Sequence, residues 1–587
     1  MNYNLNEHTK QIKKKHGVLA SLRKLTEIIS SERRNLTIAF LAIALNVGLS
    51  LLGPYLLGYT IDTHVQTKNY EGVVIFAGIL LIVYIAAYIL NYIQIRMMGG
   101  IGQRLLFRLR NDVFKKLQEL PLDFFNQNKA GDLISRINND TDNLNEFFSH
   151  SLMQFIRNFI MMLGAGVFLL TINLPLGLAT LSPTLVLMVI TISISPWIRN
   201  KNKATLKSIG NLSAEIQEGL ASFKVIVAFD RRDYFRKRLD GANKENYKKS
   251  VHAGIANSIL SPIYTFASNI GQLIVLSLGI WLISEGRFSI GLLISFIAYV
   301  SNFYNPLRQL ARLWANFQLT LAAWERISQL LSLKSNLPIR DYSESCSCSS
   351  FINFQNVSFA YPNGEKVLKN ISFELQKGKT YAFVGPTGGG KTTTASLMSR
   401  LYDATKGAIL LEGKDIRSYT PCERASKIGF ILQDPILFTG TVRENILYGN
   451  SNCGALTNKQ LEKALEDAQL LSLLKSFDQG LETPIEMGGD SISLGQKQII
   501  AFMRAILRKP KLLILDEATA NIDTVTEQKL EQILTNLPKS TTKVIIAHRL
   551  NTIENADEIF FVNSQKIIAA GSFDEALNLL MQEQGVS

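Results

Sequence analysis

The stretch Gly385-Pro-Thr-Gly-Gly-Gly-Lys-Thr392 decides how the second half of this 587-residue chain folds. It follows the apolar run 380–384 and precedes residues 393–398, so the sequence predicts a strand, a glycine-rich turn and a helix. Four glycines among six residues let backbone N–H groups converge on phosphates at the helix N-terminus. We expect Lys391 to reach the β- and γ-phosphates and Thr392 to hold Mg²⁺. The other residues expected to bind the nucleotide here are Gly385, Pro386, Thr387, Gly388, Gly389, Gly390 and Thr393.

A second phosphate-handling element is the run Lys511-Leu-Leu-Ile-Leu-Asp516-Glu517, in which an apolar strand ends in two adjacent carboxylates. Ligands of open α/β sheets bind at the carboxyl ends of the strands, so both acids are expected beside the nucleotide. We expect Asp516 to hold Mg²⁺, and Glu517 to orient and deprotonate the attacking water.

The first half of the chain contains long runs without charged residues. One of these runs is long enough for two membrane spans, with a break at Asn173-Leu-Pro175, and each of the others for one; the runs are 35–61, 72–95, 158–198, 253–284 and 288–307. The sequence therefore predicts six transmembrane helices. The connections 96–157 and 199–252 have helical periodicity, so we expect the membrane helices to continue far into the cytosol.

The distribution of Lys and Arg predicts the orientation in the membrane. The two long connections carry nine and thirteen of these residues, whereas the short links 62–72, 173–176 and 284–287 carry one, none and one. The long connections, the second half of the chain and both termini are therefore expected on the cytosolic side of the cell (plasma or inner) membrane. The net charge of the chain is +14, and its basic residues lie at the ends of the apolar runs. They form no basic patch interleaved with aromatic residues, which argues against nucleic acid as a partner.

These patterns divide the chain into four parts. Residues 1–34 form a basic segment with helical spacing of leucines, expected to lie at the membrane interface, and residues 35–325 form an α-helical transmembrane domain. Residues 326–350 form a polar linker, and residues 351–587 form an α/β P-loop nucleotide-binding domain.

A third motif lies between the two phosphate elements, at Ile492-Ser493-Leu494-Gly495-Gln496, just before a helix that we expect over residues 499–507. It resembles the signature Leu-Ser-Gly-Gly-Gln of the ATP-binding cassette (ABC) family. The resemblance implies ATP and Mg²⁺ as cofactors. It also implies that Ser493, Gly495 and Gln496 contact the ATP that an opposite cassette holds.

Four further residues stand where the family has functional residues. Tyr361 resembles the aromatic residue that stacks on adenine, and Gln433 resembles the glutamine that meets Mg²⁺ and the attacking water. Asp523 matches the loop that crosses the dimer interface, and His548 matches the histidine that contacts the γ-phosphate.

The membrane half resembles the exporters of the same family. The segments 120–125, 131–136 and 138–142 are close to the pattern around the first coupling helix, and residues 218–229 resemble the second. Six spans ahead of one cassette are similar to a bacterial multidrug or lipid half-transporter, related to one half of the P-glycoprotein type.

The resemblance implies that the chain works with a second half-transporter, because one cassette lacks the opposing signature. Leu494 replaces a family glycine, and Met487 stands where exporters often have glutamate, while the catalytic Glu517 is present. This combination favours one subunit of a heterodimer and leaves a homodimer open.

The function expected from the resemblance is ATP-driven export by alternating access. Because the spans lack ionisable groups, we expect an apolar or amphipathic cargo, either drug-like molecules or lipids. An ATP-gated channel or regulator of the same architecture and a homodimeric lipid flippase are the alternatives, and an importer fits less well because the domains are fused.

Overall fold

The computed structural model describes residues 3, 5, 32–334, 337–339, 350–361, 364–450, 456–486, 489, 491–516, 524–546, 556–570 and 575. The interfacial helix predicted within residues 1–34 and the linker residues 340–349 lie outside this range. The chain divides into two compact units, each described here by itself. The membrane unit comprises Asn6–Gln118 and Gly131–Ser332, and the cassette unit comprises Met1–Leu5, Glu119–Ala130 and Leu333–Ser587.

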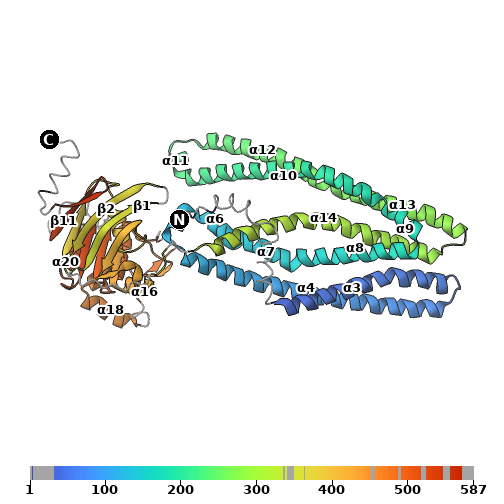
Figure 1. Ribbon diagram of the computed structural model, residues 1–587, viewed down its shortest axis with the longest axis horizontal. Helices are drawn as coiled ribbons and strands as arrows, with labels where there is room; N and C mark the ends of the chain where they lie inside the picture. The colour runs from blue at the N-terminus through green and yellow to red at the C-terminus, as the bar shows by residue number, and fades with distance from the viewer. Residues whose placement is uncertain are drawn as a thin grey trace. The chain divides into compact units, whose positions relative to one another are not determined.

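The described residues of the membrane unit are helical apart from short turns (Figure 1). Its elements are α3 (Arg33–Thr60), η2 (Ile61–Val65), α4 (Tyr70–Glu119), α6 (Ala130–Ser135), η3 (Arg136–Asp140), α7 (Thr141–Glu146), η4 (Phe147–Ser151), α8 (Leu152–Ile172), α9 (Leu174–Leu181), α10 (Pro183–Ala221), α11 (Phe223–Ala228), α12 (Arg232–Ser258), α13 (Leu260–Ser284) and α14 (Ile290–Ser332). The short helix α5 (Leu122–Gln127) follows α4 and belongs to the cassette unit.

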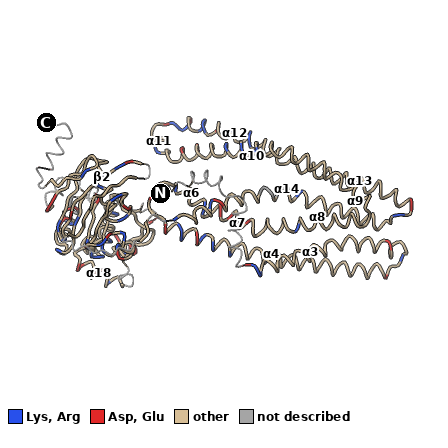
Figure 2. Tube along the Cα trace, in the orientation of Figure 1, with Lys and Arg blue, Asp and Glu red and all other residues tan. Residues whose placement is uncertain are grey.

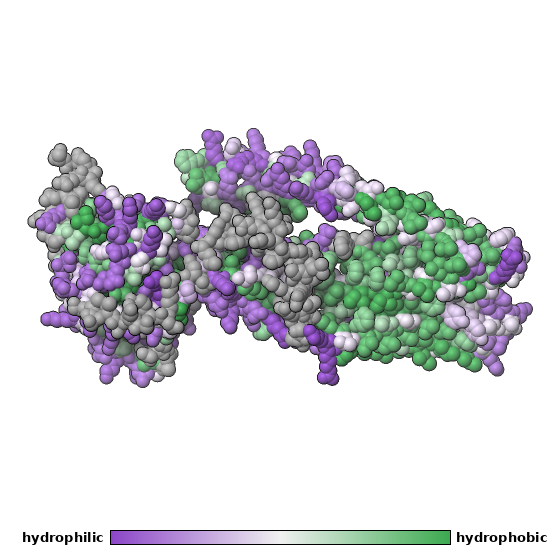
Figure 3. Space-filling model, in the orientation of Figure 1, coloured by the Kyte–Doolittle hydropathy of each residue, from purple (hydrophilic) through white to green (hydrophobic). Residues whose placement is uncertain are grey.

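Six helical stretches of the described residues are long and apolar enough to cross a membrane, as predicted. They are Arg33–Val65, Tyr70–Glu119, Ala130–Ile172, Leu174–Ala221, Arg232–Ser284 and Ile290–Leu310. Figure 2 shows Lys and Arg along α10 to α12, and Figure 3 shows apolar side chains gathered over the charge-free part of the unit. The long connections are helical, which confirms that the membrane helices extend beyond the spans.

The predicted break at Asn173 lies between α8 and α9. Its side chain caps α9 by accepting a hydrogen bond from the N–H of Leu176 at 3.0 Å, and Pro175 sits in the first turn, where a missing N–H costs nothing.

Two amide side chains of the spans bind neighbouring helices. Asn46 on α3 donates to the carbonyl oxygen of Ala87 at 2.6 Å, and Asn158 on α8 donates to Gln309 on α14 at 3.0 Å. These amides therefore hold helices together within the membrane unit.

The cassette unit contains two main sheets. An antiparallel sheet has the order β2-β1-β4-β5, with strands β1 (Ile352–Ala360), β2 (Lys366–Leu375), β4 (Lys406–Leu411) and β5 (Lys414–Asp415). A largely parallel sheet has the order β12-β11-β3-β10-β9-β6, with strands β3 (Thr380–Val384), β6 (Ile428–Ile431), β9 (Leu512–Asp516), β10 (Thr542–Ile546), β11 (Glu558–Asn563) and β12 (Lys566–Ala569). All five residues of β9 are buried, as expected for a parallel strand with both faces covered.

Helices and short elements complete the described part of the cassette unit. They are α15 (Lys391–Met398), η5 (Ile416–Ser418), α16 (Pro421–Lys427), β7 (Gly440–Thr441), α17 (Val442–Leu447), α18 (Asn458–Asp467), η6 (Leu471–Ser476), η7 (Gly480–Glu482), β8 (Pro484–Ile485), α19 (Leu494–Ile506) and α20 (Thr524–Thr535). The sequence placed the start of α19 at Ile499, which is wrong, because the helix begins within the signature motif.

Candidate functional site

The phosphate loop joins β3 to α15, as the sequence predicted. Gly385 has φ +141°, and a Cβ there would lie 2.2 Å from the carbonyl oxygen of Val562, so this position requires glycine. A Cβ on Gly389 would lie 2.6 Å from the same oxygen. β11, which carries Val562, therefore approaches the loop too closely for side chains at either position.

The ammonium group of Lys391 lies against the loop. Its Nζ donates to the carbonyl oxygens of Gly385 at 2.8 Å and Pro386 at 3.0 Å, and the residue is only 6% exposed. This places a fixed positive charge at the N-terminus of α15, where the helix dipole also favours an anion.

The two phosphate-handling elements meet at Thr392 and Asp516. Thr392 Oγ1 donates to Asp516 Oδ1 in a long hydrogen bond of 3.4 Å, and Asp516 is 3% exposed at the end of β9. A hydroxyl and a carboxylate together are oxygen ligands of the kind that Mg²⁺ takes, completed by waters and phosphate oxygens.

Gln433 follows the neighbouring strand β6. Ile431 of β6 pairs with Leu515 of β9, so Gln433 and Asp516 leave adjacent parallel strands at the same edge of the sheet. This is the edge at which a nucleotide on α15 is expected.

The expected adenine-binding residue, Tyr361, is part of an aromatic cluster. Its ring meets Tyr402 edge-on with 5.5 Å between centroids, and its hydroxyl lies 3.0 Å from Thr393 Oγ1 on α15. Tyr402 in turn accepts a hydrogen bond from Asn126 Nδ2 of α5 at 2.8 Å, and burial raises the pKa of Tyr402 to about 12. A chain of contacts thus runs from the helix of the phosphate loop to α5.

The signature motif forms the first turn of α19. Ser493 is the N-cap: its Oγ accepts from the N–H of Gln496 at 3.2 Å, and its own N–H donates to Gln496 Oε1 at 2.8 Å. Gln496 Nε2 also donates to the carbonyl oxygen of Ser476 at 2.6 Å. The Gln496 side chain therefore fixes the start of the helix, a structural role that the sequence did not predict. Gly495 lies in the same first turn, and Leu494 is 39% exposed.

Three predicted site residues, Glu517, Asp523 and His548, lie outside the described residues, as does Met487. Their roles stay predictions.

Sequence reasoning also missed Arg504, which connects α19 to α17 and the segment after Gln433. Its guanidinium donates to the carbonyl oxygens of Asn445 at 2.8 Å and Ile436 at 3.1 Å and to Asn445 Oδ1 at 3.1 Å, and it lies over the ring of Tyr448. The partners of Arg504 lie 59 and 68 positions away in the sequence, so the spacing of the motifs could not predict these hydrogen bonds.

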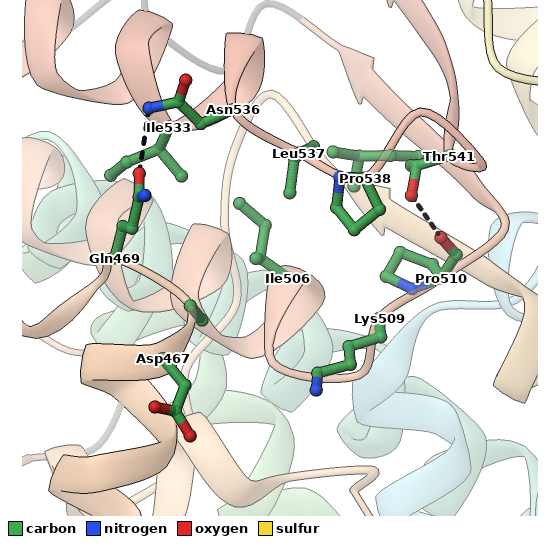
Figure 4. A pocket seen from close by; sticks show the side chains of 12 residues that line it. Asp467, Gln469, Ile506, Lys509, Pro510, Ile533, Asn536, Leu537, Pro538 and Thr541 are labelled. Carbon is green, nitrogen blue, oxygen red and sulfur yellow. Dashed lines mark hydrogen bonds between the residues drawn. The ribbon is translucent and has the colours of Figure 1, made fainter.

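A cavity of about 240 Å³ lies elsewhere in the cassette unit (Figure 4). Lys509 and Pro510 line it just before β9 begins, and Thr541 lines it just before β10 begins. The cavity is therefore at the amino ends of the parallel strands, opposite the phosphate loop, and we do not assign it to the nucleotide site.

The fold and this site define a membrane transporter with a P-loop nucleotide-binding domain. Residues 36–307 match the ABC transporter transmembrane region, and residues 368–520 match the ABC transporter ATP-binding family. The chain belongs to the ABC transporter family and has the architecture of an exporter half-transporter.

Relatives of known source share most of the chain. An uncharacterised ABC transporter ATP-binding protein of Bacillus subtilis, YfiC, is 32% identical over 97% of this chain and 94% of its own length. A fatty acid ABC transporter ATP-binding/permease protein of Mycobacterium bovis is 33% identical over 85% of this chain and 78% of its length. A multidrug resistance ABC transporter ATP-binding and permease protein of Lactococcus lactis is 30% identical over 85% and 84%.

Proposed function

We propose that this chain is one half of an ATP-driven exporter that moves apolar or amphipathic compounds, drug-like molecules or lipids, out of the cytosol or the inner leaflet. The contact between Thr392 and Asp516 carries the proposal, because it joins both phosphate-handling elements in a chain with six membrane-crossing helices. Relatives named for multidrug resistance and for fatty acid transport support this class of cargo.

In the proposed hydrolysis, Lys391 and the loop N–H groups bind the phosphates of ATP. Thr392, Gln433 and Asp516 would hold Mg²⁺, which would supply neutralisation of the charge on the transferred phosphoryl group. Glu517 takes a proton from water, whose oxygen bonds to the γ-phosphorus while the bond to the bridging oxygen of ADP breaks. We place the adenine on Tyr361 and the γ-phosphate contact on His548.

The site is completed by a second half-transporter. Ser493, Gly495 and Gln496 of this chain close on the ATP that the partner holds, with Asp523 at the interface, and the partner's signature closes on the ATP that this chain holds. Closure of the cassettes turns the membrane helices from inward-facing to outward-facing, and hydrolysis reopens them.

Exposed apolar side chains support this partnership. On and beside α11, the expected second coupling segment, Phe223 is 58% and Phe229 74% exposed. On the cassette, Ile436 is 65% and Phe438 46% exposed. We propose that α11 of each subunit covers the corresponding cassette patch of its partner in the cytosol.

The catalytic assignment is tested with Glu517→Gln. We expect Mg²⁺-dependent ATPase activity to fall to background while ATP binding, measured with a fluorescent ATP analogue, remains. The control Glu462→Gln removes an exposed carboxylate on α18 and keeps the activity. Unchanged turnover in Glu517→Gln would refute its role as the base.

The partner is tested with the chain purified alone. Because Leu494 alters the signature, we favour a heterodimer and expect the lone chain to bind ATP with little hydrolysis. Full ATPase activity of the lone chain would instead establish the homodimer.

A further inference from the structure

Tyr3 and Leu5 are docked within the cassette unit, against the segment Glu119–Ala130 that contains α5. The two residues are 1% and 2% exposed, which is as buried as the sheet core. Burial of this degree indicates a defined binding position for this part of the chain.

Two adjacent amide side chains bind the backbone of these residues. Asn128 Oδ1 accepts from the N–H of Leu5 at 3.2 Å, and Asn128 Nδ2 donates to the carbonyl oxygen of Tyr3 at 3.0 Å. Gln127 Oε1 accepts from the N–H of Tyr3 at 2.8 Å. Asn128 Nδ2 also donates to the carbonyl oxygen of Phe124 at 2.8 Å, so the binding amide is itself fixed to α5. The backbone groups are thus satisfied much as a neighbouring strand would satisfy them.

The Tyr3 side chain joins α5 to a second segment. Its ring meets the buried Phe124 ring edge-on with 6.3 Å between centroids. Its hydroxyl donates to the carbonyl oxygen of Lys334 at 2.9 Å. Lys334 lies two residues after the end of α14, where the chain leaves the last membrane helix for the cassette.

We propose that Tyr3 is a positioning residue of the transport cycle, because it fastens α5 to the start of the linker. α5 then keeps its contact with Tyr402 of the cassette, made through the exposed side chain of Asn126, while the cassettes open and close. The proposal rests on the proposed export function, because the contact of Tyr3 with α5 and Lys334 bears force only when the cassettes open and close.

The first test measures ATP hydrolysis by the full chain with its partner in lipid nanodiscs. Tyr3→Ala is expected to lower kcat about three- to tenfold, because a loosely held cassette meets its partner less often. KM for ATP stays within about twofold, because the nucleotide site is unchanged. Asn128→Ala gives the same loss, and the double variant loses no more than either single variant. Lys129→Ala, an exposed neighbour, is the matched control with unchanged constants.

The second test does not depend on hydrolysis. In Tyr3→Ala, trypsin is expected to cleave after Lys334 several times faster than in the original chain, and Tyr3→Phe, which keeps the ring and loses the hydroxyl, lies between. Unchanged cleavage in both variants, a raised KM, or additive losses in the double variant would overturn the proposal. A chain without any ATPase activity but with the cleavage change would instead contradict the export function and leave the docking established.

Discussion

Arg504→Lys tests how firmly the signature helix holds the segment after Gln433. The substitution keeps the positive charge but replaces a planar group that makes three hydrogen bonds with an ammonium that reaches one of these oxygens. Asn445 is 2% exposed, so water cannot reach its carbonyl oxygen, whereas its Oδ1 keeps the hydrogen bond from the N–H of Phe438 at 2.9 Å and the exposed carbonyl oxygen of Ile436 is rehydrated. An unsatisfied buried acceptor costs about 1–3 kcal/mol, and we expect a local loss of about 2–3 kcal/mol.

Hydrogen exchange measures this loss in the cassette. Tryptophan fluorescence would not, since the four tryptophans lie at 197, 281, 314 and 324, in the membrane half of the chain. Amides of α17 and residues 436–441 are expected to exchange about 30- to 140-fold faster, because each 1.4 kcal/mol is a factor of about ten. Arg508→Lys, just beyond α19, is the control with unchanged exchange, because the structure records no Arg508 hydrogen bond among the described residues. Equal exchange in Arg504→Lys, or acceleration spread evenly over the cassette, would refute the reasoning.

Three further predictions concern the cassette. Gly385→Ala places a Cβ 2.2 Å from the Val562 carbonyl oxygen and is expected to abolish binding of a fluorescent ATP analogue; retained affinity would contradict the tight approach of β11. Tyr402→Phe removes the acceptor for Asn126 and is expected to lower ATPase kcat by about two- to fivefold with ATP affinity unchanged; a change in affinity alone would argue against a link to α5. Burial tends to raise the pKa of Glu412, but hydrogen bonds from Lys427 and Lys511 lower it below the usual 4.5, so its stabilising effect is present above pH 4.5 and is lost as the pH falls through the folded-state pKa. Urea unfolding of Glu412→Gln is therefore expected to show lower stability than the original chain at pH 7 and a difference that shrinks below pH 4.5; a constant difference would refute the assignment.

The fold class could be predicted because the sequence patterns that indicate it are continuous segments of neighbouring residues. The thickness of the bilayer sets the length that an uncharged segment needs to cross it, so such segments can be counted from the sequence. Asn173 followed by Pro175 marks a helix start through capping alone. The meeting of Thr392 with Asp516 was predictable for a similar reason, since parallel strands bring their carboxyl ends to one edge.

Other parts of the site depend on contacts between distant residues. Asn126 and Tyr402 are 276 positions apart, and their hydrogen bond leaves no periodic trace in the sequence. The predicted start of α19 at Ile499 is wrong by five residues, although Ser493 and Gln496 have the spacing of a capping box that marks Leu494 as the first helical residue.

The capped first turn of α19 has a consequence for the proposed closure of two cassettes. With Ser493 and Gln496 bonded to each other and Gln496 bonded to Ser476, the signature is already ordered before any partner approaches. Its meeting with a second cassette then needs no folding of the motif, and little conformational entropy is lost there.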